Sequence, residues 1–82
     1  MTPIMSTKNL ELVLTVLREV LVENGVPSIK MGPETRILED TPLDSLQLAL
    51  VVVKLEEATG KDPFSNGFLP FRTVGELAAL YD

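Results

Sequence analysis

The stretch DSLQLALVVVKLEEATG, residues 44–60, decides the fold of this chain. Its run of three valines also suits a buried strand, but the stretch continues without a turn signal up to Gly60, and this length favours a helix. Asp44 is a favoured N-cap residue, and Gln47 occupies the reciprocal position of a capping box. We therefore predict a helix that begins at Asp44-Ser45 and ends at Gly60, where glycine tolerates a left-handed backbone.

A second helix is predicted before this one, because apolar residues recur at spacings of three and four over residues 9–23. Ser6 or Thr7 can serve as its N-cap. Asn24-Gly25 supplies the stop signal, and a proline follows shortly afterwards.

A third helix is predicted at the end of the chain. Thr73 and Glu76 form a second capping box, which marks its start. Its apolar residues are Val74, Leu77, Ala78, Leu80 and Tyr81, and they are expected to face the core.

The two connections are rich in proline. Residues 26–43 carry only isolated apolar residues and predict a long loop, which Ile37 and Leu38 are expected to anchor in the core. Residues 61–72 leave room only for a short helical turn between the second and third helices. The predicted fold is all-α, a small bundle of three main helices plus one short helix, in a single domain over residues 1–82, of which 1–6 form a frayed N-terminal extension.

Composition excludes several classes of function. With Asp and Glu at 12, Lys and Arg at 7 and a net charge of -5, the surface repels phosphate backbones, so nucleic acid is not an expected partner. The chain has no cysteine and no histidine, which removes Ser-His and Cys-His catalysis and the usual zinc ligands. Acidic pairs such as Glu39-Asp40 remain for an enzyme, but a solvated face explains them more simply, and we do not expect an enzyme.

No membrane partner is expected either. Residues 1–7 lack the basic stretch and apolar core of a signal peptide. The longest apolar run, residues 48–53, is too short to span a bilayer, so the cytoplasm is the expected location.

The motif Leu43-Asp44-Ser45-Leu46 resembles the attachment motif of the acyl carrier protein family. It follows a proline-containing loop with the acidic pair Glu39-Asp40. It also precedes LEEATG at 55–60 and RTVGE at 72–76, which are similar to the family's helix end and last helix start. With the first helix included, the resemblance covers nearly the whole chain and implies a discrete carrier protein.

The resemblance implies that Ser45 receives phosphopantetheine from coenzyme A, with Asp44 supporting the attachment. Acyl, aminoacyl or peptidyl groups would then ride on the arm as thioesters. The implied partners are a phosphopantetheinyl transferase, an acyl- or aminoacyl-loading ligase and downstream synthase or transferase enzymes, which a monomer would visit in turn. The alternative is an unmodified helical interaction module in which Asp44 and Ser45 only cap the helix.

The central helix is apolar nearly all round, so part of it is either core or a docking surface. If Ser45 faces outward, Leu46, Leu50 and Val53 line a docking face with Glu56 and Glu57 at its far end; the alternative is that these three are ordinary core. Gln47 is a candidate partner contact or only a member of the capping box. Fatty-acid members of the family carry acidic residues early in this helix, where this chain has Gln47 and Leu50. This difference favours a polyketide or nonribosomal peptide type of pathway. Fatty-acid synthesis is the alternative. The phenylalanines Phe64, Phe68 and Phe71 either fill the core or shape a cargo cleft.

Overall fold

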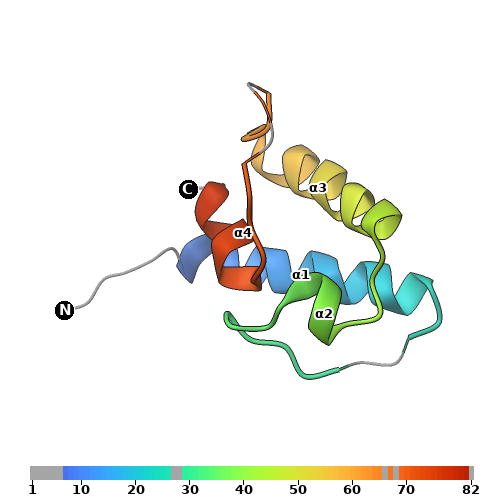
Figure 1. Ribbon diagram of the computed structural model, residues 1–82. Helices are drawn as coiled ribbons and strands as arrows, with labels where there is room; N and C mark the ends of the chain where they lie inside the picture. Colours follow the sequence, from blue (N-terminus) through green and yellow to red (C-terminus); the bar gives the residue numbers. More distant parts are fainter. Residues whose placement is uncertain (1–6, 27–28, 66, 68, 82) are drawn as a thin grey trace.

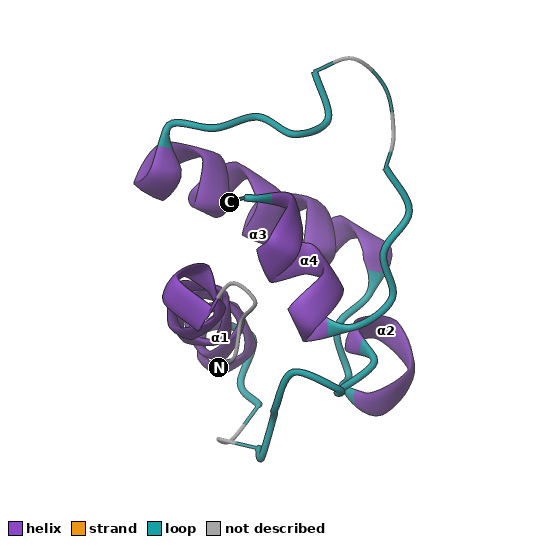
Figure 2. Ribbon diagram, turned by 90° about the vertical axis from the view of Figure 1, so that its left-hand side faces the viewer, coloured by secondary structure: helices purple, strands orange, loops and turns teal. Residues whose placement is uncertain are grey.

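The computed structural model describes residues 7–26, 29–65, 67 and 69–81. They form the helices α1 (Thr7–Glu23), α2 (Ile37–Asp40), α3 (Ser45–Thr59) and α4 (Val74–Leu80). The longest helix, α1, packs against both α3 and α4, which lie on the same side of it (Figure 1, Figure 2). The predicted all-α bundle of three main helices and one short helix is confirmed, and the expected N-terminal extension and the Ser6 cap fall outside the described residues.

The core lies between the three main helices. Full burial of an aliphatic side chain contributes about 1.5–3 kcal/mol, so the side chains that meet here fix the helices to one another. The largest fully buried ones are Val13, Leu17, Val20, Ile37, Val51, Leu55, Val74, Leu77 and Tyr81. The predicted core face of α4 is thereby confirmed, with Leu80 half-buried at its edge.

The predicted glycine stops end both long helices. Gly25 has a φ of 80°, its N–H donates to the Val22 carbonyl at 3.0 Å, and the Val26 N–H donates to the Leu21 carbonyl at 2.9 Å. This pair of bonds is a Schellman motif, which satisfies the last carbonyls of α1. Gly60 ends α3 in the same left-handed region, with a φ of 73°.

The short helix lies in a different connection from the predicted one. The sequence predicts a helical turn within residues 61–72 and a loop over 26–43, whereas α2 lies within the latter and the described part of 61–72 has turns only. The reason is a partner distant in sequence: the Ile37 N–H, at the start of α2, donates to the Arg72 carbonyl at 2.9 Å. Local sequence patterns carry no information about such a bond.

A helix of four residues can bury only one side. Ile37 is 1% exposed and belongs to the core, but Leu38 is 49% exposed. The expectation that both anchor the loop is therefore right for Ile37 and wrong for Leu38.

Two further backbone bonds join the loop before α2 to the start of α4. The Val74 N–H donates to the Thr35 carbonyl at 3.0 Å, and the Gly75 N–H donates to the Pro33 carbonyl at 2.9 Å. A Cβ at position 75 would lie 3.1 Å from that carbonyl oxygen, so glycine permits the close approach. These bonds hold the α2 segment against the helical bundle.

Candidate functional site

A reciprocal capping box fixes the start of α3. The Asp44 carboxylate accepts a hydrogen bond from the Gln47 N–H at 2.8 Å, and the Gln47 side-chain oxygen accepts one from the Asp44 N–H at 3.1 Å. Both bonds satisfy backbone donors that the first turn of a helix leaves free. The predicted box is confirmed, and it accounts for Gln47 without any partner contact.

Ser45 is the first residue of α3 and is exposed at the surface. Among the described residues, no side-chain hydrogen bond involves its hydroxyl. The first N–H groups of the helix and the positive end of its dipole lie beside this hydroxyl, which is the arrangement that stabilises a phosphate group. The geometry thus offers an accessible hydroxyl next to a site suited to a phosphodiester.

The approach to Ser45 is anchored in the protein. Thr41 is buried, its hydroxyl donates to the Ile37 carbonyl at the start of α2, and the same oxygen accepts from the Leu43 N–H at 3.2 Å. Leu43 is itself 4% exposed and belongs to the core. The residue two positions before Ser45 is therefore fixed, although Ser45 itself faces solvent.

The exposed side of α3 is apolar. Leu46 is 79% exposed, Leu50 42% and Val53 48%, while Val51 and Leu55, on the opposite side, are fully buried. Their spacing of four and three places the three exposed residues along one face of the helix. The alternative that they belong to the core is wrong. We call Leu46, Leu50 and Val53 the apolar ridge.

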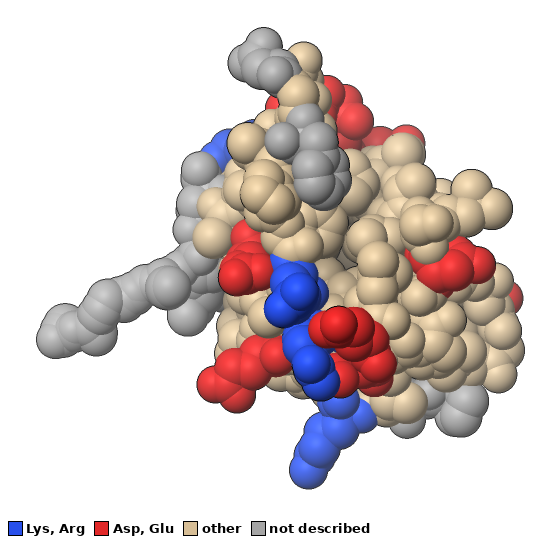
Figure 3. Space-filling model, viewed as in Figure 1, with Lys and Arg blue, Asp and Glu red and all other residues tan. Residues whose placement is uncertain are grey.

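Glu56 and Glu57 are exposed at the C-terminal end of α3. At 1.5 Å per residue, Glu56 lies about 17 Å along the helix axis from Ser45. Uncharged residues form most of the surface over α3 in the view of Figure 3. The half of α3 nearest Ser45 carries no acidic side chain, because the first acidic residue of the helix is Glu56.

A shallow pocket lies between α2, α3 and the segment before α4. Its volume is about 280 Å³, and its lining residues come from α2, α3 and the segment before α4: Ile37, Leu38, Glu39, Leu48, Phe71 and Arg72. Leu48 lies one turn after Ser45 on the neighbouring side of the helix. Phe64 and Phe71 are both half-buried against the core, and their ring centroids lie 5.9 Å apart. Phe71 also lines the pocket. Phe68 lies outside the described residues.

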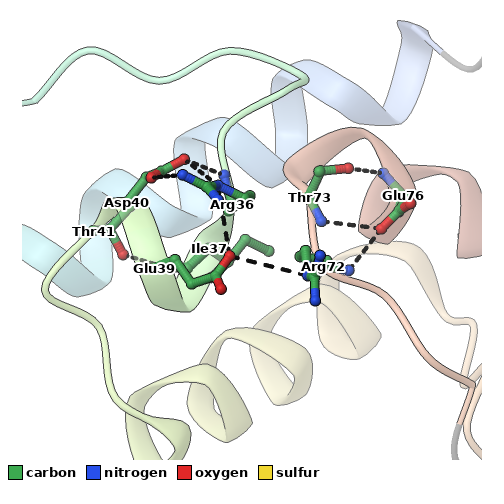
Figure 4. A network of polar contacts seen from close by, with 8 residues as sticks. All are labelled: Arg36, Ile37, Glu39, Asp40, Thr41, Arg72, Thr73 and Glu76. Atoms are coloured by element: carbon green, nitrogen blue, oxygen red, sulfur yellow. Dashed lines mark hydrogen bonds and ion pairs between the residues drawn. The ribbon is translucent and has the colours of Figure 1, made fainter.

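Arg36 pairs with both acidic residues of α2, and the Glu39–Arg72 ion pair joins α2 to the segment before α4 (Figure 4). The Arg36 guanidinium donates to both oxygens of Asp40, at 3.0 and 3.2 Å, and lies 3.5 Å from Glu39. Glu39 in turn lies 4.0 Å from Arg72. Basic side chains on this face accordingly form a stripe bordered by acidic ones (Figure 3). Both carboxylates of α2 are thus used within the protein.

Hydrogen bonds lower the pKa values of two exposed carboxyl groups, Asp40 and Glu76. The hydrogen bond from the Arg36 side chain holds the pKa of Asp40 below its ordinary value of 3.8. The Arg72 and Thr73 N–H groups donate to Glu76 at 2.7 and 3.1 Å, and they lower the pKa of that carboxyl below its ordinary 4.5. Both pKa values are shifted away from neutral pH, so neither group can act as a proton shuttle there.

Sequence reasoning missed Thr41 and the contacts of Arg36 and Arg72. The spacing of four between Arg36 and Asp40 was an available signal, since such a pair stabilises a helical turn. The Arg72 contacts had no comparable signal, because they join segments distant in the chain.

No group of three or more potential metal ligands occurs among the described residues, and none of the helices within them is long and apolar enough to cross a membrane.

Comparison with known proteins gives two curated relatives. The chain is 30% identical over 66 residues to Acyl carrier protein 2 of Ralstonia nicotianae, a match that covers 79% of this chain and 82% of that protein. It is 33% identical over 76 residues to Acyl carrier protein MbtL of Mycobacterium sp. strain MCS, covering 92% of this chain and 85% of the relative. No family model matches the chain, and no solved structure gives a significant match. The two relatives cover most of the chain and show that it belongs to the acyl carrier protein family.

Proposed function

We propose that this protein carries acyl, aminoacyl or peptidyl groups on a phosphopantetheine arm attached to Ser45. The observation that carries the proposal is an exposed hydroxyl at the first position of α3, directly after a capping carboxylate. Membership of the acyl carrier protein family supports a carrier and not a catalyst. Residues 1–82 would act as one carrier domain in the cytoplasm, as a monomer.

Attachment would use groups already placed at the start of α3. The Ser45 oxygen would form a bond to the pantetheine-bearing phosphorus of coenzyme A while the pyrophosphate P–O bond breaks and adenosine 3′,5′-bisphosphate leaves with its electron pair. The hydroxyl proton would pass to a base of the transferase. The first N–H groups of α3 would stabilise the resulting phosphodiester. Asp44 would hold the helix start and help orient the reacting phosphate. Once attached, the arm's terminal thiol supplies the thioester chemistry that a chain without cysteine cannot supply itself.

Partner enzymes would dock on α3 beside the arm. The proposed contact residues are the apolar ridge, with Gln47 at one end and Glu56 and Glu57 at the other. A small exposed apolar surface gives weak, exchangeable contacts, and a carrier that visits several enzymes in turn needs such contacts. A tether plus a docking surface raises the effective concentration of cargo at each active site. The partners would be a phosphopantetheinyl transferase, a loading ligase and downstream synthase or transferase enzymes.

A polyketide or nonribosomal peptide type of pathway is the better fit to this surface. Enzymes that recognise an acidic helix would find only uncharged residues between Ser45 and Lys54 on α3. The enzyme that loads the arm identifies the pathway. The choice of pathway is tested by comparing how well ligases that activate amino acids, aryl acids or fatty acids load the modified protein. Loading by a fatty-acid ligase alone would favour the fatty-acid alternative.

Intact mass measurement tests the carrier function against an unmodified interaction module. The full chain is incubated with coenzyme A and a broad-specificity phosphopantetheinyl transferase, with the Ser45→Ala variant as the matched control. A single added phosphopantetheine that is absent from the variant supports the carrier. If the wild-type protein gains no mass while the transferase modifies a reference carrier in the same reaction, Ser45 is only a helix residue.

A further inference from the structure

We infer, on the basis of the proposed carrier function, that the partner surface that receives this protein is apolar around the entrance for the arm and that docking depends little on salt. The occupant of the apolar ridge would be an enzyme that presents uncharged, apolar side chains there and not a basic patch. The inference is carried by where the charges of this protein lie.

The two acidic groups of α2, in the segment before α3, are paired with arginines within the protein. Glu39 lies 3.5 Å from Arg36 and 4.0 Å from Arg72, and Asp40 binds Arg36 through both oxygens. The two cations and two anions of these ion pairs sum to zero, and Glu76, whose carboxylate accepts the Arg72 and Thr73 N–H groups, adds one negative charge at the start of α4. A basic partner surface would meet these carboxylates together with the two arginines that already pair with them, so the four groups attract it only weakly.

Asp44 is the remaining acidic group beside Ser45, and the proposed attachment chemistry already uses it. Its carboxylate also accepts the Gln47 N–H at 2.8 Å. It offers one charge at the edge of the ridge and not a charged face.

The unpaired acidic residues of α3 are too far away to steer docking near the arm. Glu56 lies about 17 Å from Ser45 along the helix. The screening length at physiological ionic strength is about 8 Å, so its field at the arm is largely screened. The net charge of -5 therefore does not describe the surface around Ser45.

The apolar ridge, by contrast, leaves three large side chains in water at the position where a partner must approach. Leu46, next to Ser45, is 79% exposed, the highest value among the exposed large hydrophobic residues described. Covering such side chains on docking provides a favourable free energy that salt does not screen. The ridge and the paired charges of α2 together specify an apolar partner.

The test uses a broad-specificity phosphopantetheinyl transferase as the probe and measures kcat/KM for the apo protein at low and high salt. The variants are Leu46→Ala/Leu50→Ala on the ridge, Glu56→Gln/Glu57→Gln at the far end, and Val22→Ala, an exposed apolar control on α1. Each variant is compared with wild type in the same salt, so the transferase's own response to salt cancels in the ratio. Thermal melting confirms that each variant is folded.

We expect the ridge variant to lose about tenfold in kcat/KM at both salt concentrations. The Val22→Ala variant should stay within about twofold of wild type, because Val22 lies on α1 outside the proposed docking surface. The glutamine variant should lose less than the ridge variant, because its two charges lie at the far end of that surface. If the glutamine variant loses as much as the ridge variant, and the loss shrinks at high salt, docking is electrostatic and this inference is wrong although the carrier function stands. If no protein gains phosphopantetheine, the carrier function fails and the inference falls with it.

Discussion

Replacing Asp44 by alanine and by asparagine separates the structural role of this carboxylate from its proposed role in attachment. Asparagine caps a helix about as well as aspartate but carries no charge. In the folded protein the Asp44 carboxylate accepts one backbone bond of 2.8 Å from Gln47, and an amide oxygen can accept the same bond. Alanine removes both the cap and the charge.

The loss of the cap bond predicts the size of the stability change. Removal of an N-cap side chain costs about 1 kcal/mol, which lowers the melting temperature of a chain of this size by about 4–8 °C. Asp44→Ala should show that loss, and Asp44→Asn should remain close to wild type. Thr73→Ala is the matched control, because Thr73 heads the equivalent capping box of α4, with a bond of 3.1 Å from the Glu76 N–H.

The rate of phosphopantetheine attachment should respond differently. If the carboxylate orients the reacting phosphate, both Asp44 variants should lose about tenfold or more in kcat/KM, since a charge-assisted contact contributes about 1.5–3 kcal/mol. Thr73→Ala should lose stability without losing this rate. A normal attachment rate in Asp44→Asn would refute the reasoning and reduce Asp44 to a helix cap.

Three further predictions concern the core and the titrating groups. Leu55→Ala should lower the unfolding free energy by about 2–5 kcal/mol, because this leucine is fully buried, whereas Leu46→Ala should change it by less than about 0.5 kcal/mol, because Leu46 is exposed. Denaturant unfolding of both variants measures the difference. The folded pKa values of Asp40 and Glu76 lie below their ordinary 3.8 and 4.5, so their stabilisation is present above those values and is lost as pH falls through the folded pKa; a melting temperature that does not fall in acid would contradict this. Burial raises the pKa of Tyr81, the one tyrosine of the chain, to about 12, so ultraviolet titration should show that midpoint, and stability should fall above pH 10; a midpoint near 10 in folded protein would contradict it.

The sequence was sufficient where structure depends on local bonds. Both capping boxes join residues three positions apart, and both were predicted from Asp44 with Gln47 and from Thr73 with Glu76. The glycine that ends α3 is a local signal of the same kind. The start of α3, and with it the position of Ser45, could therefore be predicted without coordinates.

The sequence was insufficient where structure depends on contacts between distant segments. The position of α2 is set by a bond from Ile37 to the carbonyl of Arg72, and the pairing of Glu39 with Arg72 has the same long range. The exposure of Leu46 could not be decided either, because α3 is apolar nearly all round. Only the packing of α3 against α1 determines which leucines face solvent.

Site localisation by mass spectrometry tests the central claim most directly. The chain has serines at positions 6, 28, 45 and 65. After reaction with coenzyme A and the transferase, the full-length protein is digested and its peptides are fragmented. We predict one phosphopantetheine, on Ser45 alone. Modification of another serine, or an unmodified peptide around Ser45 in a reaction that modifies a reference carrier, would contradict the account.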